Sequence, residues 1–177
     1  MNRDRIIMIA RTAVILAVVV VVQMVGRTLP YNNFIVGPLV NMCLLVAAMT
    51  VGLGGGIAIA VLSPFTSLIN NNAPLAAALL PFAPFIALAN IVLVVTFYLL
   101  YDKNKYVGLV LAAALKFGVL FCAVRIFLNI FDFTKFAEKL LSQFSWSQLL
   151  TAVIGGIVAL PVIYRLRKAM KYKETIV

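Results

Sequence analysis

Residues 106–130 read YVGLVLAAALKFGVLFCAVRIFLNI, an almost unbroken apolar run that contains two cations, Lys116 and Arg125. About twenty apolar residues, each rising about 1.5 Å, are enough to cross the hydrocarbon core of a bilayer, so this run predicts a membrane-spanning helix. A charged side chain near the bilayer centre costs about 2.5–3.5 kcal/mol on insertion scales. Two such cations need a protein partner, a water-filled cavity or an anionic ligand, and this need points to a functional site.

The two cations are not equivalent. They lie nine positions apart, and at about 100° per residue this places Lys116 and Arg125 on opposite faces of an ideal helix. Arg125 shares its face with Asn129, and we expect both to face a ligand site. Lys116 shares its face with Ala112 and Ala113, small residues that allow close helix packing, so we expect it in a helix seam or on the floor of a cavity. The alternative for both cations is structural, with neighbouring carbonyls and amides satisfying them.

The composition indicates an all-α integral membrane protein. Of the 177 residues, 64% are hydrophobic and 11% are charged, with a mean hydropathy of +1.12, whereas about 25% of a soluble domain is charged. The net charge is +10, but the cations cluster at the ends of apolar runs, which indicates membrane topology rather than nucleic-acid binding.

Histidine is absent from the sequence, which excludes histidine-ligated haem, histidine-based zinc sites and histidine-dependent catalytic triads. Both cysteines, Cys43 and Cys122, lie within apolar runs and are expected to pack as small residues rather than form a disulfide. We therefore expect no metal site and no cofactor.

We predict a single membrane domain over residues 1–177, with six transmembrane helices and one short amphipathic helix. Gly52–Gly56 is expected to form a tight reversal, Pro64 to kink a helix, and Asp102–Lys105 to form a charged turn. The amphipathic helix is expected to lie flat at the interface or to fold over the mouth of the bundle. The predicted spans are 6–25, 37–51, 57–69, 79–101, 106–130 and 148–164, with the amphipathic helix at 132–144 between the last two.

An even number of spans places both termini on one side of the membrane. Because cytoplasmic loops carry an excess of Lys and Arg, the distribution of cations predicts a multi-pass protein of the cell membrane with both termini in the cytoplasm. The terminal side carries Arg3, Arg5, Arg11, Lys103, Lys105, Arg165, Arg167, Lys168, Lys171 and Lys173, and the other side carries Arg27, Lys135 and Lys139.

Several asparagines accompany the two cations. Asn41 lies about one turn inside the second span, and Asn90 lies near mid-membrane, where it needs a partner that Lys116 or Asn41 could supply. Short spans broken by Gly or Pro indicate a transporter binding site, although the loop at 70–74 is equally typical of a solvated turn. Because Arg125 could hold a carboxylate or phosphate bidentately, we expect an anionic or zwitterionic ligand. The candidate substrate-binding residues are Arg125, Asn129, Asn41, Asn70, Asn71, Asn72, Asn90 and Lys116.

Over nearly its whole length the chain resembles the substrate-binding S component of energy-coupling factor (ECF) transporters, small proteins that capture vitamins, related micronutrients or metal ions. The residues that carry the resemblance are Ala13 and Ala17, Gly37–Asn41, Gly52–Gly56, Ser63–Pro64, Asn70–Pro74 and Pro81–Asn90.

The resemblance implies a binding subunit that has no enzymatic activity of its own. It implies that Ala13 and Ala17 pack against a membrane-embedded coupling subunit and that the ligand site lies toward the outside. It also implies two partner ATPases, whose ATP hydrolysis drives toppling of the S component in the bilayer. The lack of histidine argues against the members that take nickel or cobalt.

Two other classes of function stay open at this point. In a membrane scaffold or assembly subunit, Lys116 and Arg125 would join helices without binding a ligand. A membrane-embedded hydrolase or transferase would need a carboxylate pair or a metal site within the membrane. The five acids all lie at span ends or in loops, at Asp4, Asp102, Asp132, Glu138 and Glu174, which disfavours an enzyme.

Overall fold

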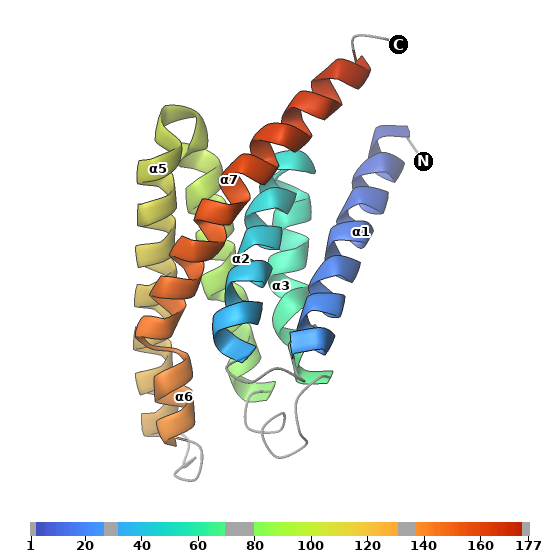
Figure 1. The fold of residues 1–177 in the computed structure, drawn as a ribbon. Helices are drawn as coiled ribbons and strands as arrows, with labels where there is room; N and C mark the ends of the chain where they lie inside the picture. The colour runs from blue at the N-terminus through green and yellow to red at the C-terminus, as the bar shows by residue number, and fades with distance from the viewer. Residues whose placement is uncertain (1–2, 27–31, 70–79, 131–136, 175–177) are drawn as a thin grey trace.

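The computed structural model describes residues 3–26, 32–69, 80–130 and 137–174, and the regular elements in these ranges are helices (Figure 1). Four of these helices are long and apolar enough to cross a membrane, and a shorter apolar helix accompanies them at Leu53–Leu68. The elements are α1 (Arg3–Gly26), α2 (Asn32–Thr50), α3 (Leu53–Ile69), the short 3₁₀ helix η1 (Leu80–Phe82), α5 (Ala83–Ile130), α6 (Ala137–Gln143) and α7 (Trp146–Glu174).

The long helix α5 is broken at Asn104, where φ is −160° and ψ is 105°. The Asn104 side chain accepts hydrogen bonds from the backbone N–H groups of Tyr106 (3.0 Å) and Val107 (3.1 Å), as an N-cap does, so a new helix starts there. The arms on either side of the break run antiparallel, and Gly108 packs on Leu100 across the hairpin (Figure 1). The predicted turn at 102–105 is confirmed.

The predicted reversal at Gly52–Gly56 is wrong in its extent. Only Gly52 has a positive φ, of 110°, and α3 begins directly after it, so the remaining glycines are helical. A Cβ on Gly56 would lie 2.9 Å from the Cα of Ala48. Gly56 therefore allows α3 to pack closely on α2 rather than extending the turn.

Other boundaries also differ from the prediction. The helix α2 begins at Asn32 instead of residue 37, and α7 extends to Glu174 instead of residue 164. Both extensions add polar residues to an apolar span. A prediction based on hydropathy alone ends the span before such residues. Pro64 lies inside α3, which continues through it to Ile69.

The amphipathic segment forms α6 over Ala137–Gln143, and its predicted first residues, 132–136, lie outside the described ranges. Leu140 and Phe144 are buried in a cluster with Phe82 and Phe127. The rings of Phe82 and Phe144 have centroids 4.8 Å apart. The apolar face of α6 therefore packs onto the bundle.

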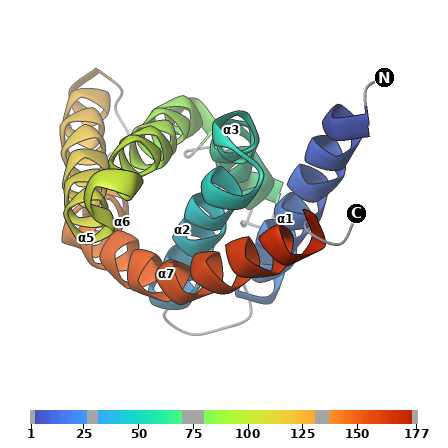
Figure 2. The ribbon, with the colours of Figure 1, turned by 90° about the horizontal axis from the view of Figure 1, so that it is seen from above.

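The centre of the bundle is α2, which contacts α1, α3, α5 and α7 (Figures 1 and 2). Its residues Leu44, Leu45, Ala47 and Ala48 are fully buried. The helix α1 lies at one edge of the bundle, against α2 and α3 (Figure 2).

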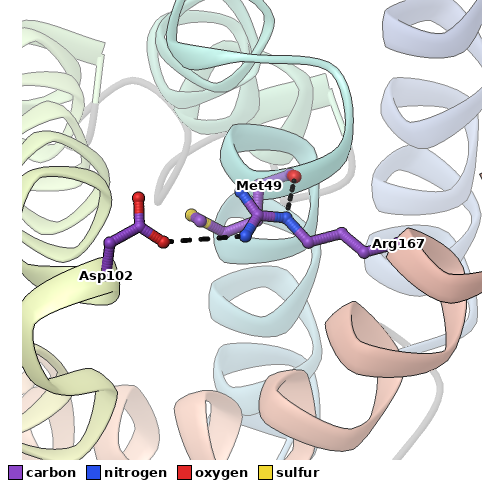
Figure 3. A network of polar contacts seen from close by, with 3 residues as sticks. All are labelled: Met49, Asp102 and Arg167. Atoms are coloured by element: carbon purple, nitrogen blue, oxygen red, sulfur yellow. Dashed lines mark hydrogen bonds and ion pairs between the residues drawn. The ribbon is translucent and has the colours of Figure 1, made fainter. Parts of the chain in front are cut away.

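Both termini lie at the same end of the bundle (Figure 1). There Arg167 of α7 donates a hydrogen bond from Nε to the carbonyl of Met49 (3.0 Å), while its Nη1 lies 3.9 Å from Oδ1 of Asp102 (Figure 3). Its guanidinium also lies over the ring of Tyr101, 5.0 Å from the centroid. This side chain ties α7 to the last turn of α2 and to the first arm of α5.

Candidate functional site

A cavity of about 140 Å³ lies at the end of the bundle opposite the termini. Because α1, α2, α3, both arms of α5, α6 and α7 all contribute to it, the cavity depends on the assembly of the whole bundle. Its lining residues are Gln23, Asn33, Val36, Gly37, Val40, Asn41, Ser63, Pro64, Ser67, Leu68, Ile86, Asn90, Lys116, Gln143, Phe144 and Gln148.

Lys116 is the one cation among the described residues that line this cavity, and only 4% of its surface is exposed. Its Nζ donates hydrogen bonds to Oδ1 of Asn41 (2.6 Å) and to Oδ1 of Asn90 (2.8 Å). Three helical segments are thereby joined at one atom: α2 and the two arms of α5. An ammonium group carries three N–H donors, so the geometry leaves one for a ligand in the cavity.

A further hydrogen bond fixes the orientation of the Asn90 amide. Asn90 donates from Nδ2 to Oγ of Ser63 (3.2 Å), which turns its Oδ1 toward Lys116. Gln23 of α1 donates to the Ser63 carbonyl (2.9 Å) and accepts a hydrogen bond from the Thr66 hydroxyl (2.8 Å). The polar network therefore runs from α1 through α3 to the lysine, and its groups are held in place before any ligand arrives.

The charge of the described residues that line the cavity is positive. Among the described residues that line it there is no carboxylate, so the oxygens that Lys116 contacts belong to neutral amides. A buried charge is stabilised by an opposite charge in addition to hydrogen bonds. The floor of the cavity can therefore bind an anionic group, while Val36, Leu68 and Phe144 supply apolar surface for the rest of a molecule.

Three of the predicted site residues come together here: Asn41, Asn90 and Lys116. Of the two partners expected for Asn90, Lys116 or Asn41, the structure shows a hydrogen bond with Lys116, and Lys116 is among the residues that line the cavity. The predicted residues Asn70, Asn71 and Asn72 lie outside the described ranges.

The expected position of Arg125 is corrected by the structure. Arg125 and Asn129 are exposed and do not line the cavity. The Arg125 guanidinium lies over the ring of Phe121, 3.4 Å from its centroid, and donates to the Phe121 carbonyl (3.3 Å). The nine-residue spacing from Lys116 places the arginine on the outer face of the arm because the helix does not bend enough to reverse it.

The sequence analysis missed several polar residues that line the cavity. Gln23 is 7% exposed, and it stands alone as an amide near the end of the first apolar run. The reasoning applied to Asn90, that an amide within a span needs a partner, would also have identified Gln23. Ser63 likewise precedes a proline within an apolar run. The remaining polar residues of the lining are Asn33, Ser67, Gln143 and Gln148.

Ala13 and Ala17 lie on the exposed face of α1. The opposite face, which includes Ile15, Val19 and Gln23, packs on the bundle. The two alanines therefore present a flat strip that is directed away from the rest of the chain.

A family model described as "ECF transporter, substrate-specific component" matches residues 8–167. Comparison with curated proteins and with solved structures gave no match. The matched range contains the cavity, the lysine network and the exposed strip of α1.

Proposed function

This chain belongs to the family of ECF transporter substrate-specific components, and from that premise we propose that it binds a vitamin-like micronutrient for import. Its family makes it a transporter subunit rather than an enzyme. S components bind a small molecule and associate with an ECF module made of a transmembrane subunit and ATPase subunits. The substrate we propose is anionic or zwitterionic, and it occupies the cavity above Lys116.

The observation that carries this proposal is the buried ammonium on the cavity floor. Lys116 is held by two neutral amides and faces a cavity whose described lining contains no acid. A carboxylate or phosphate that accepts a hydrogen bond from Nζ would complete its coordination and neutralise its charge. The volume of about 140 Å³ is below the roughly 300–1,000 Å³ of drug-sized pockets, which favours a small substrate.

The topology we propose has six passes, because the two arms of α5 each cross the bilayer. The reversal at Asn104 then lies on the same side as the termini, together with Lys103 and Lys105. By the excess of cations this side is cytoplasmic, so the cavity opens to the exterior. That orientation suits a subunit that captures its substrate outside the cell.

Mass spectrometry of small molecules released from the purified protein tests the proposal. We expect one acidic or zwitterionic compound in about equimolar amount, and its affinity can then be measured by calorimetric titration. If the protein releases no compound and co-purifies with no ATPase subunits, the carrier proposal is overturned. The lysine would then be a structural link between helices in a membrane scaffold.

The strip of α1 is the proposed contact with the coupling transmembrane subunit. We expect Ala17→Trp to reduce co-purification of that subunit and the ATPases at least tenfold, because an indole prevents close helix approach. Substrate affinity should stay within twofold, since Ala17 is exposed and does not line the cavity. Val18→Trp, at another exposed position of α1, is the matched control. Equal co-purification of the two variants would remove the strip from the interface.

A further inference from the structure

Two hollows lie at the terminal end of the bundle, apart from the cavity above Lys116. One has a volume of about 470 Å³ and the other about 700 Å³, and they share Arg11, Thr50 and Met170. They lie where α1 and the long end of α7 stand apart over the end of α2 (Figure 1). The extension of α7 beyond the predicted span is what forms one wall.

The smaller hollow is lined almost entirely by apolar side chains. Its apolar lining includes Val14 and Ile15 of α1, Leu166 and Met170 of α7, and Val51. Val14 and Leu166 are exposed, at 65% and 42%. Apolar surface of this kind, at the edge of a membrane-spanning bundle, suits a hydrocarbon chain.

The larger hollow is strongly basic. Its cations are Arg11, Arg167 and Lys168, and among the described residues that line either hollow there is no acid. The hydroxyl-bearing side chains of Thr50, Tyr101 and Tyr164 complete its polar lining. Arg167 is fixed by the Met49 carbonyl (Figure 3) and by the Tyr101 ring, so part of the positive charge is preorganised.

Asp102 only partly offsets this charge. Its carboxylate lies 3.9 Å from Arg167 and is 86% exposed, so solvent screens the ion pair. Arg11 and Lys168 are both exposed, and no ion pair of either is found among the described residues. The basic hollow therefore retains an excess of positive charge.

We propose that the two hollows together bind one anionic phospholipid of the cytoplasmic leaflet. Its phosphate lies against Arg11, Arg167 and Lys168, and one acyl chain lies along Val14, Ile15 and Leu166. Basic pockets between membrane helices on the cytoplasmic side bind anionic headgroups in this way. The charge selects the headgroup, and the adjoining apolar hollow selects a lipid over a free phosphate. The site is independent of the proposed substrate.

Native mass spectrometry of the detergent-purified chain tests this site with phosphatidylglycerol and phosphatidylcholine that carry the same acyl chains. We expect phosphatidylglycerol to be retained at least fivefold more. The double substitution Arg11→Gln/Lys168→Gln should lower its retention at least fivefold. Lys103→Gln/Lys105→Gln removes two exposed cations at the same end but outside the hollows, and should change retention less than twofold.

Three outcomes would overturn the proposal. Equal retention of the two lipids shows that the headgroup is not selected, and equal loss in both double variants shows that general surface charge is responsible. If soluble glycerol 3-phosphate displaces phosphatidylglycerol completely at millimolar concentration, the site binds a free phosphate compound instead.

Lys168→Glu, at an exposed position, gives a second variant should the double variant unfold, and it should also lower retention of phosphatidylglycerol at least fivefold. Loss of lipid with unchanged substrate affinity separates this site from the cavity above Lys116.

Discussion

Lys116→Met is expected to lower the affinity for the proposed substrate, the compound released from the purified protein, at least tenfold. Hydrogen bonds to charged groups contribute about 1.5–3 kcal/mol, and each 1.4 kcal/mol is a tenfold change in affinity. The free energy of unfolding should fall by about 1–3 kcal/mol, because the Oδ1 atoms of Asn41 and Asn90 lose their donor while both amides stay buried. Calorimetric titration and thermal unfolding in the same detergent measure the two effects.

Arg125→Ala is the matched control, since it removes a cation from the same arm of α5. Arg125 contacts Phe121 and does not line the cavity, so substrate affinity should change less than twofold. If Arg125→Ala lowers substrate affinity tenfold and Lys116→Met leaves it unchanged, the ligand site lies on the outer face of α5 instead.

Gly155→Ala is expected to destabilise the bundle although it adds a single methyl group. A Cβ at this position would contact the carbonyl oxygen of Pro38 and would lie 2.8 Å from the Cβ of Asn41. Since the carbonyl belongs to the backbone of α2, it cannot rotate away, and overpacking of this kind costs about 1–3 kcal/mol. The shift would also move Asn41, which holds Lys116, so substrate affinity should fall with stability.

Gly118→Ala provides the comparison, because nothing lies within 4 Å of a Cβ built there. Its melting temperature should equal or slightly exceed that of the unmodified protein, since Gly is the poorer helix former. Thermal unfolding of the two variants side by side tests the contrast. An equal melting temperature for both would mean that α7 can move away from α2 without loss.

Much of the fold could be predicted from the sequence because hydropathy is a strong signal in membrane proteins. Apolar runs near the lengths of α1 and of both arms of α5 appear in the sequence, and Asn104 lies in the predicted charged turn. The ends of helices were harder to predict. The helix α7 continues through basic residues that hydropathy assigns to a tail, and Arg167 stabilises the extension through Met49 and Asp102.

The site could be predicted only in part. Asn41, Asn90 and Lys116 could be identified because an isolated polar side chain in an apolar span needs a partner. Arg125 was expected at the ligand site and lies outside the cavity, because an ideal helix offers both faces equally and packing makes the choice. The small residues around Lys116, Ala112 and Ala113, let the neighbouring helices approach that face, and both are fully buried.

The hairpin at Asn104 sets the position of Lys116 along the bundle relative to Asn90. Asn90 precedes the turn by fourteen positions and Lys116 follows it by twelve, so the two arms bring these side chains level with each other. Adding or deleting one residue between them would rotate one side chain by about 100° and shift it by about 1.5 Å. The helical segments that lead from Asn90 to the turn and from the turn to Lys116 are thereby held to fixed lengths, and an insertion within either of them would disconnect the ammonium from its amide.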